Sequence, residues 1–368
     1  MSAHRVTLIP GDGIGPELVE ATRRVLEATG VAFDWDVQQV GEPAMELYGT
    51  PLPDSVAESV RANGVALKGP ISKPRVAGFR SANIALRVAS GLYANVRPCR
   101  TYPGVNSRFE DVDVVVIRDV TEDVYAGVEA MAGSPEAEAI IATIREVLPK
   151  AHIADGAAIT IRAISEEASR RLAEYAFTYA RENNRRKVTA VHKASVMKAT
   201  DGVFLDAVRE VAERNTDIEF EEILVDALAM HMVQHPERFD VMVMPMQYGD
   251  IISDLAAGFI GGPGMMPGGN YGTHAVLFEP GHGSAPHMAG QNRANPIATM
   301  LSGVMMLRHL EEWTAAERLE AAISEVVREG RATTYDLRED RDDPTAGSTS
   351  GVADAVIAKL EAAVPSGR

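Results

Sequence analysis

The chain has 368 residues, of which 46% are hydrophobic and 24% are charged, and its formal net charge is −16. A chain with this much apolar sequence can bury a large core, which excludes disorder as its main state. The acidic balance argues against a broad nucleic-acid-binding surface, because phosphate binding needs a basic face. The single cysteine, Cys99, excludes an intrachain disulfide and a zinc site built on cysteines.

The N-terminal segment bears on the location of the protein. It reaches glycine and proline after one short apolar run, which is too short for the core of a secretory signal peptide. No run approaches the ~20 apolar residues that cross a bilayer. We therefore expect a cytoplasmic protein with neither a membrane nor a nucleic-acid partner. At roughly 100–200 residues per domain, the length allows two domains, or one large α/β unit with an insertion.

Short β-rich runs alternate with longer helical patterns along the chain, which predicts α/β layers. Helices are predicted over 16–29, with Pro16 at the first position, and over 165–182, which opens at Ser165. The glycine- and proline-rich segment 261–269 and the acidic segment 336–343 are predicted to be loops. The predicted strands are 6–9, 65–67, 112–117, 188–191, 241–244 and 275–278.

Three glycines follow the first predicted strand and precede the first predicted helix, in the sequence Gly11-Asp-Gly-Ile-Gly15. Dinucleotide-binding folds bind a pyrophosphate at such a turn. The spacing here differs from G-x-G-x-x-G, a proline follows the third glycine, and no acidic residue ends an apolar strand about 20 residues further on. By itself the turn leaves both a structural and a functional role open.

Polar and basic side chains are concentrated between residues 81 and 118. Arg118 directly follows the predicted strand 112–117, at the end where open α/β sheets bind ligands. Guanidinium groups bind carboxylates through two parallel hydrogen bonds, so several arginines suit a di- or tricarboxylate. The alternative is that these arginines are ordinary surface charges. The candidate anion-binding residues are Ser81, Asn83, Arg87, Arg97 and Arg118.

Two aspartates, Asp250 and Asp254, follow the predicted strand 241–244 at a spacing of four residues, which places them on one face of a helix. Like charges at this spacing are destabilising unless a cation bridges them. Ligand sets made of oxygen atoms select Mg²⁺ or Mn²⁺ rather than zinc. A third carboxylate, Asp226, stands inside an apolar run. The alternative is one aspartate at a helix N-terminus and one that is solvated.

Together these segments resemble the β-decarboxylating hydroxyacid dehydrogenases, the isocitrate/isopropylmalate dehydrogenase family, which also contains homoisocitrate and tartrate dehydrogenases. The resemblance extends over nearly the whole chain, and Tyr248-Gly-Asp-Ile-Ile-Ser-Asp254 is its most specific segment. Residues 81–98 look most like the isocitrate branch. The other segments that carry the resemblance are 8–17, 282–286 and 305–310.

The resemblance implies an α/β fold with a large and a smaller α/β domain. The large domain would comprise residues 1–100 and 242–368. The smaller domain would comprise residues 101–241 and carry the contacts of a homodimer. The active sites of that homodimer would be shared between its two subunits.

The resemblance also implies a reaction, in which a 2-hydroxy acid gives a hydride to a nicotinamide and the resulting 2-oxo acid loses its β-carboxylate. A divalent cation, Mg²⁺ or Mn²⁺, stabilises the enolate that forms. The implied metal ligands are Asp250, Asp254 and Asp226 of the partner subunit. Lys193 would deprotonate the hydroxyl across the dimer interface, and Tyr125 would protonate the enol.

The remaining residues of the implied active site bind the substrate. Arg87, Arg97 and Arg118 would hold its carboxylates. Ser81 and Asn83 would contact its distal carboxylate and the nicotinamide end of the cofactor.

The cofactor of this family lies on a loop and not on a dinucleotide-fold turn. NAD-dependent members usually have an aspartate at the position of His287, whereas NADP-dependent members often have Lys-Tyr at 287–288, with a tyrosine and an arginine further on. Here Tyr335 is present but Glu339 replaces the arginine, so we expect NAD. NADP is not excluded, since Arg293 could compensate. The implied cofactor-binding residues are Glu279, His282, Gly283, Ser284, Ala285, His287, Met288 and Asn295.

The sequence departs from the isocitrate pattern at several positions near the nicotinamide and the distal end of the substrate. The positions are Val120, Asp123, Ser195, His231 and Met246. The loss of amides there predicts a changed substrate pocket, whereas the retained arginines, tyrosine, lysine and three aspartates predict an intact reaction. The leading prediction is oxidative decarboxylation of isocitrate to 2-oxoglutarate with NAD. The alternatives are the same reaction on homoisocitrate, a phosphonate isostere, isopropylmalate or tartrate, or a non-catalytic regulatory subunit.

Overall fold

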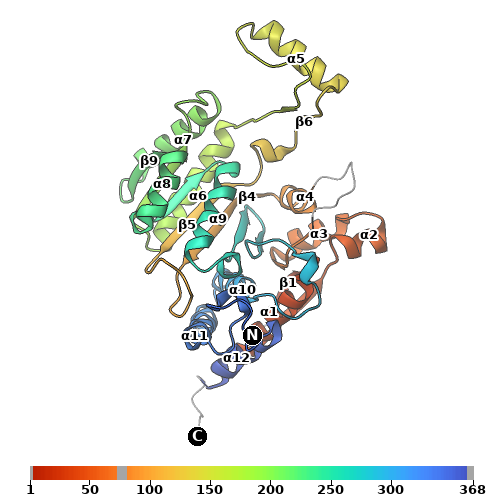
Figure 1. Ribbon diagram of the computed structural model, residues 1–368, viewed down its shortest axis with the longest axis vertical. Coiled ribbons are helices and arrows are strands. Elements are labelled where there is room, and N and C mark those ends of the chain that lie inside the picture. Colours follow the sequence, from red (N-terminus) through yellow and green to blue (C-terminus); the bar gives the residue numbers. More distant parts are fainter. Residues whose placement is uncertain (1–2, 73–80, 363–368) are drawn as a thin grey trace.

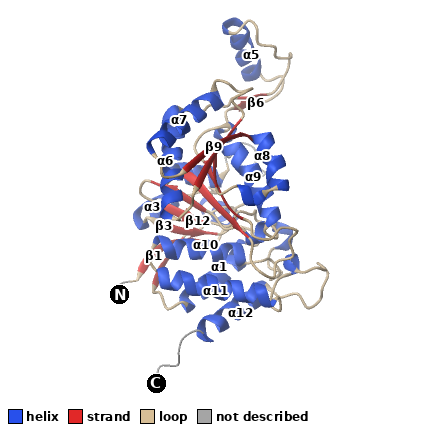
Figure 2. Ribbon diagram, turned by 90° about the vertical axis from the view of Figure 1, so that its left-hand side faces the viewer, coloured by secondary structure: helices blue, strands red, loops and turns tan. Residues whose placement is uncertain are grey.

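A computed structural model describes residues 3–72 and 81–362 of the chain. One sheet of ten strands runs through the molecule, with helices packed on its faces (Figures 1 and 2). This arrangement confirms the predicted α/β class. In their order across the sheet, the strands are β2 (Phe33–Val37), β1 (His4–Ile9), β3 (Val65–Lys68), β12 (Val276–Phe278), β11 (Gly269–Gly272), β4 (Leu92–Arg100), β5 (Asp113–Asp119), β10 (Val241–Met244), β8 (Lys187–His192) and β9 (Glu219–Leu224).

The helices follow the apolar periodicity of the sequence. In α6, the side chain of Ser165 caps the N-terminus by accepting a hydrogen bond from the amide of Ala168, as the predicted start at this serine requires. The helices are α1 (Gly15–Ala28), α2 (Glu42–Tyr48), α3 (Asp54–Asn63), α4 (Ala82–Ala89), α5 (Pro135–Val147), α6 (Glu166–Glu182), α7 (Thr200–Arg214), α8 (Val225–Gln234), α9 (Met246–Phe259), α10 (Ile297–His309), α11 (Trp313–Glu329) and α12 (Thr349–Ala362).

The six predicted strands are confirmed as β1, β3, β5, β8, β10 and β12, and the two predicted helices as α1 and α6. Their apolar runs are buried, as in β3, β10 and β12 along their whole length. None of the described helices has the length and apolar character needed to span a bilayer.

An antiparallel strand in the middle of the sheet positions two of the predicted arginines. β4 pairs antiparallel with both β5 and β11, whereas β5 pairs parallel with β10. In the β4–β5 register Asn95 lies opposite Arg118, and Arg97 lies opposite Val116. Because alternate residues share one face of a strand, Arg97 and Arg118 project from the same face of the sheet.

The sheet contains strands from both predicted domains, and β4 and β5 join at the predicted boundary near residue 100. Two large apolar cores pack against it. One core includes α1, α10, α11 and α12, and the other includes α6 and α7. The division into domains at residues 100 and 241 stays a prediction.

A small arm extends from the body of the molecule, beyond α7 and α9 in both ribbon views (Figures 1 and 2). It consists of α5 and a two-stranded sheet of β6 (Glu129–Ala130) and β7 (Ile159–Thr160). Only Ala137 and Ile141 of α5 are buried. The arm therefore has little core of its own in a single chain.

Candidate active site

Asp250, near the start of α9, is the centre of the predicted substrate site. It lies one helical turn before Asp254, as the sequence predicts. Its Oδ1 accepts a hydrogen bond from Arg118 Nη2 at 2.9 Å and lies 3.6 Å from Arg97 Nη2. Its Oδ2 accepts a hydrogen bond from the Tyr125 hydroxyl at 3.0 Å. The fold therefore brings together the predicted proton donor, a predicted metal ligand and two predicted substrate arginines.

The charges around Asp250 determine its protonation state. Burial opposes ionisation of the carboxyl, but Arg118 and Arg97 outweigh burial and hold the pKa of Asp250 below its ordinary value. Burial raises the pKa of the Tyr125 phenol, and the Asp250 carboxylate raises it further. Near neutral pH, Asp250 is thus a carboxylate and Tyr125 is a phenol that can donate a proton.

Arg97 links the two aspartates of α9. Its Nη1 donates a hydrogen bond to Ser253 Oγ at 2.6 Å and lies 3.8 Å from Asp254 Oδ1. The Asp254 side chain is 72% exposed, so its carboxylate can reach a ligand from solvent. Asp250 and Asp254 supply only oxygen atoms, and such a pair fits Mg²⁺ or Mn²⁺.

The predicted substrate-binding residues of α4 lie beside this group. Ser81 precedes the helix, and Asn83 and Arg87 belong to its first two turns; all three are partly buried. Asn83 Oδ1, Arg87 Nε and Arg118 Nε are buried and have no hydrogen-bond partner in the described part of the chain. Buried polar atoms normally have a partner, because an unpaired one costs free energy. This pattern is typical of a site that binds a ligand.

A buried ion-pair network connects the substrate side to the cofactor side. Glu279, directly after β12, accepts hydrogen bonds from Arg87 Nη2 at 2.6 Å and from Asn270 Nδ2 at 2.7 Å. Lys68 Nζ at the end of β3 lies 2.7 Å from its other carboxylate oxygen. Burial opposes the charge of Glu279, but Lys68 and Arg87 hold its pKa well below the ordinary value. The network therefore keeps an ionised glutamate inside the protein.

Lys68 is a residue of the site that the sequence analysis missed. Its side chain is 2% exposed, and burial lowers its pKa although Glu279 opposes this. β3 and β12 are parallel neighbours with Leu67 opposite Phe278, so the residues that follow them meet at one edge of the sheet. The sequence did contain a signal for this residue, because Lys68 is a charged residue at the end of the apolar strand β3.

The glycine turn after β1 supports the predicted cofactor loop. The Ser284 carbonyl accepts a hydrogen bond from the Ile14 amide at 2.9 Å. A Cβ at Gly13, where φ is +59°, would lie 2.0 Å from that carbonyl oxygen, so this position needs glycine. Ser284 Oγ also lies 2.9 Å from Ser72 Oγ. The turn thus has a structural role, and it positions the loop.

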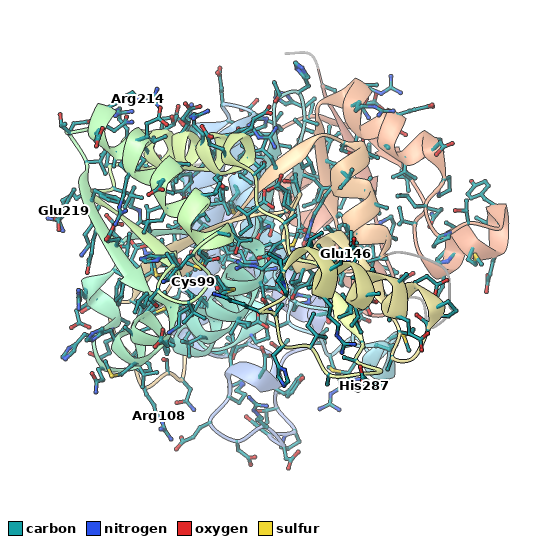
Figure 3. All side chains as sticks on the ribbon, turned by 90° about the horizontal axis from the view of Figure 1, so that it is seen from above. Cys99, Arg108, Glu146, Arg214, Glu219 and His287 are labelled. Carbon is teal, nitrogen blue, oxygen red and sulfur yellow. The ribbon has the colours of Figure 1, made fainter. Side chains whose placement is uncertain are left out.

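The predicted cofactor residues themselves form a partly exposed loop. His282 Nδ1 lies 3.0 Å from the Gly283 carbonyl, and its Nε2 is buried without a partner in the described residues. Burial lowers the pKa of His282, so the ring is neutral at pH 7. Ala285 has a φ of +36°, and His287 is exposed (Figure 3). A neutral ring with an unpartnered nitrogen can bind a polar group of a ligand.

The end of this loop packs against the segment that carries the predicted specificity residues. Asn295 Nδ2 donates a hydrogen bond to Asp336 at 2.9 Å. The guanidinium of Arg293 lies over the Tyr335 ring, 5.2 Å from its centre, and Tyr335 also contacts the sulfur of Met288 at 3.7 Å. Arg293 therefore lies beside the predicted adenosine end.

The predicted catalytic lysine, Lys193, and the predicted metal ligand Asp226 lie apart from the Tyr125–Asp250 group. Lys193 Nζ contacts Asp226 Oδ1 at 2.5 Å. Among the described residues neither makes a hydrogen bond or ion pair with Tyr125, Asp250 or Asp254. Within residues 3–72 and 81–362 no three acidic, histidine or cysteine side chains are grouped to hold a metal ion. A single chain therefore does not bring the three predicted metal aspartates together.

Two of the departures from the isocitrate pattern have a packing explanation. Val120 and Met246, which replace amide residues, are each 1% exposed and belong to an apolar cluster that Tyr125 packs against. Ser195 is exposed, close to Lys193 in sequence. Val120 and Met246 thus form part of the apolar cluster against which Tyr125 packs.

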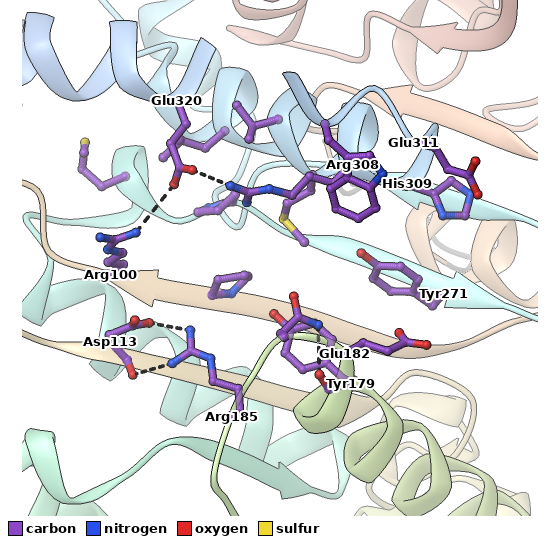
Figure 4. Close-up of a pocket in the computed structure, with 18 of the residues that line it drawn as sticks. Arg100, Asp113, Tyr179, Glu182, Arg185, Tyr271, Arg308, His309, Glu311 and Glu320 are labelled. Carbon is purple, nitrogen blue, oxygen red and sulfur yellow. Dashed lines mark hydrogen bonds and ion pairs between the residues drawn. The ribbon is translucent and has the colours of Figure 1, made fainter. Parts of the chain in front are cut away.

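A large cavity in the described part of the chain does not coincide with this site. It has a volume of about 730 Å³ and is lined by residues that include Arg100, Asp113, Tyr179, Arg308 and Glu320 (Figure 4). Its arginines are paired, Arg308 with Glu320 at 2.5 Å and Arg185 with Asp113 at 2.6 Å. Asp113 and Arg118 lie at opposite ends of β5, roughly 16 Å apart at the usual rise per residue. The cavity lies away from the predicted chemistry.

Comparisons with known proteins agree with this geometry. A model of the family described as isocitrate/isopropylmalate dehydrogenase matches residues 5–356. The probable mitochondrial NAD isocitrate dehydrogenase subunit alpha of Drosophila melanogaster is 46% identical over 336 residues, which cover 90% of this chain and 83% of the relative. The mitochondrial NAD isocitrate dehydrogenase catalytic subunit 5 of Arabidopsis thaliana is 45% identical, with 90% of this chain and 83% of the relative covered.

A solved structure shows the same fold. The crystal structure of isocitrate dehydrogenase from Methylococcus capsulatus matches with a TM-score of 0.88 and 45% identity, covering 97% of this chain and 99% of that one.

The prediction of a cytoplasmic protein is wrong by these comparisons, since the curated relatives are mitochondrial proteins. An N-terminal apolar run too short for a secretory signal peptide does not distinguish the cytoplasm from other compartments. The relatives are also named as subunits, and that leaves the homodimer a proposal.

The resemblance inferred from the motifs, the match along most of the chain and the shared fold lead to one assignment. The chain belongs to the isocitrate/isopropylmalate dehydrogenase family of β-decarboxylating dehydrogenases.

Proposed function

We propose that this enzyme oxidises isocitrate with NAD and decarboxylates the product to 2-oxoglutarate, with Mg²⁺ or Mn²⁺ present. The observation that carries the proposal is the group around Asp250, where Arg97, Arg118 and Tyr125 converge on one carboxylate. The relatives named as NAD isocitrate dehydrogenases support both the substrate and the cofactor.

The arginines account for substrate binding and orientation. Arg97 and Arg118 project from one face of the sheet, and Arg87 approaches from α4 with an unpartnered Nε. Three guanidinium groups match the three carboxylates of isocitrate better than the two of isopropylmalate or tartrate. In the proposed site Ser81 and Asn83 contact the distal carboxylate.

Proton transfer is assigned to Tyr125 and Lys193. Tyr125 holds its proton over the neutral pH range and would return it to the enol carbon after carbon dioxide leaves. Lys193 of the partner subunit would take the hydroxyl proton as the hydride moves to the nicotinamide. When bound to Asp250, Asp254 and Asp226 of the partner subunit, the divalent cation supplies stabilisation of the enolate charge.

The homodimer is proposed from an exposed apolar surface beside Lys193. Met230 and Val233 of α8 are 50% and 54% exposed, and Ile251 of α9 and Val196 are 62% and 71% exposed. α8 and α9 contact each other, and exposed apolar side chains on neighbouring elements are typical of an interface. The partner proposed for this surface is a second copy, because Lys193 and Asp226 lie beside it and complete the predicted site only from another chain.

The test is NADH formation by the purified protein with isocitrate, homoisocitrate, isopropylmalate, tartrate and a phosphonate analogue. We expect the highest kcat/KM with isocitrate, loss of turnover in excess EDTA, and recovery with Mg²⁺. NAD should be preferred over NADP by about tenfold, or roughly 1.4 kcal/mol. A higher kcat/KM with another acid would identify that acid as the substrate. Unchanged turnover in EDTA would contradict the proposed metal dependence.

A matched pair of variants separates catalysis from folding. Asp250→Asn removes one anionic ligand and should abolish turnover while the melting temperature stays near that of the native protein. Asp217→Asn removes an exposed carboxylate that pairs with Arg181 at 2.9 Å outside the site, and it should leave turnover unchanged. Full activity of Asp250→Asn would contradict the proposal. A purified protein that turns over none of the acids would support the regulatory-subunit alternative.

A further inference from the structure

A partly buried arginine outside the predicted site, Arg162, joins the two segments that carry the proposed catalytic residues. Arg162 lies two residues after the end of β7, and its side chain is 12% exposed. Its Nε donates a hydrogen bond to Asp123 Oδ1 at 2.6 Å, and its Nη1 donates one to Asp201 Oδ1 at 2.5 Å. The side chains of Asp123 and Asp201 are 1% and 0% exposed. One guanidinium thus forms ion pairs with two buried carboxylates.

Asp123 holds the segment of Tyr125. Its Oδ1 accepts a hydrogen bond from the Val124 amide at 2.8 Å, at the start of the short 3₁₀ turn that contains Tyr125. Its Oδ2 accepts a hydrogen bond from the Gln247 amide at 3.0 Å, in the first turn of α9. Its φ is +67°, a strained conformation for aspartate that persists only where surrounding bonds enforce it. Asp123 therefore fixes Tyr125 relative to the helix of Asp250.

Asp201 holds the segment of Lys193. Its Oδ2 accepts a hydrogen bond from the Lys193 amide at 2.5 Å and one from the Tyr248 hydroxyl at 3.0 Å. The Arg162 guanidinium also lies over the Tyr248 ring, 5.2 Å from its centre. Because Asp201 lies in the first turn of α7, it ties the turn after β8 to that helix.

The Arg162 guanidinium connects the Asp123 segment to the Asp201 segment. Burial opposes the charge of Arg162, but Asp123 and Asp201 outweigh it and raise its pKa above the ordinary value. Without the guanidinium, two buried carboxylates would have no counter-charge, and an uncompensated buried charge is strongly destabilising. The segments would relax apart, and the side chains that they carry would move with them. The planar guanidinium of an arginine also fixes the directions of its hydrogen bonds, whereas the ammonium of a lysine does not.

We propose that Arg162 is a positioning residue that sets Tyr125 and Lys193 of one chain at the same time. The proposal depends on the proposed function, in which Tyr125 acts in its own subunit's site and Lys193 acts in the partner's. Arg162 of each subunit therefore supports both active sites of the dimer, one through the tyrosine and the other through the lysine.

The test uses heterodimers that carry one variant chain and one native chain, purified through two different tags. With Tyr125→Phe or Lys193→Ala in the variant chain, one of the two sites keeps its native residues, so about half of the activity should remain. With Arg162→Gln, each site has one displaced residue, so less than about a quarter should remain. Asp123→Asn and Asp201→Asn each loosen one segment, so each should leave about half.

Arg185 provides the matched control. It is also a partly buried arginine between two aspartates, bonded to Asp113 at 2.6 Å and to Asp240 at 3.1 Å, and it lies outside the site. A heterodimer with Arg185→Gln should keep its full kcat even if its melting temperature falls. In the Arg162→Gln homodimer, kcat should fall by at least about tenfold while KM for isocitrate changes less, because Arg162 touches no predicted substrate residue.

Each result decides a separate point. An Arg162→Gln heterodimer with half or more of the native activity would overturn the proposal, because Arg162 would then act on one site or on neither. Failure of the Tyr125→Phe heterodimer to keep half would instead contradict the shared sites of the proposed function. If Arg162→Gln does not fold, Arg162→Lys takes its place. A heterodimer with Arg162→Lys that keeps half or more of the native activity would likewise overturn the proposal.

Discussion

Both oxygens of the Asp250 carboxylate have a partner, one from an arginine on β5 and the other from a tyrosine after it. The sequence marks these residues by local patterns, the end of a strand for Arg118 and a helical spacing for Asp250. Their contact depends on how α9 packs over β5, which no local pattern contains. The pairing of Lys68 with Glu279 was missed for the same reason, because the two residues are far apart in sequence.

Tyr125 gives a prediction at the scale of one residue. Tyr125→Phe should slow overall turnover by at least about tenfold, since the enol loses its proton donor. Reduction of the 2-oxo intermediate with NADH should stay near the native rate, because that step does not use this proton. Stopped-flow measurement of the two steps tests the assignment, and an equal loss in both would make Tyr125 structural.

Glu279 gives a prediction about pH. Lys68 and Arg87 hold its pKa below the ordinary value, so the ionised carboxylate stabilises the folded state. For a lowered pKa, this contribution is complete above the unfolded pKa of about 4.3 and is lost as the pH falls toward the folded value. The native protein should therefore melt well above Glu279→Gln at pH 7, and the difference should shrink below about pH 4. A difference that is constant from pH 7 to pH 3 would contradict the ion-pair network.

At the scale of elements, apolar runs predicted the buried strands, and apolar periodicity with a serine cap predicted α6. β4 was missed because Pro98 and two arginines interrupt its alternation, and β9 because three glutamates give it little apolar character. Both strands are formed by their neighbours in the sheet. The sequence predicted a turn at the glycines of residues 11–15, but not its role. That role is the contact of the turn with Ser284, which is distant in sequence.

The glycine turn can be tested with two alanine substitutions. Gly13→Ala would place a Cβ 2.0 Å from the Ser284 carbonyl oxygen, which must then move together with the cofactor loop. We expect a rise in KM for NAD of at least about fivefold with little change in KM for isocitrate. Gly30→Ala is the control, because Gly30 also has a positive φ of +89° but has open space around it. Equal effects of the two substitutions on KM would show that backbone strain alone is responsible.

At the scale of the whole molecule, the proposed sharing of active sites between two subunits predicts complementation. Lys193→Ala and Tyr125→Phe homodimers should each be nearly inactive. After subunit exchange, the mixed dimer has one site with both native residues, so activity should rise to about a quarter of the native value at equal mixing. Native mass spectrometry would verify the exchange. No rescue after verified exchange would place Lys193 and Tyr125 in a single chain's site.

The α5 arm has a consequence for how the protein behaves on dilution. Only Ala137 and Ile141 of this helix are buried within one chain, and in the proposed dimer we expect the arm to gain packing from the second copy. In the proposed dimer, ordering of the arm and association of the subunits are then one equilibrium, whose position follows the law of mass action. The melting temperature should rise with protein concentration, and the arm should be the first region to exchange its amide hydrogens as the enzyme is diluted.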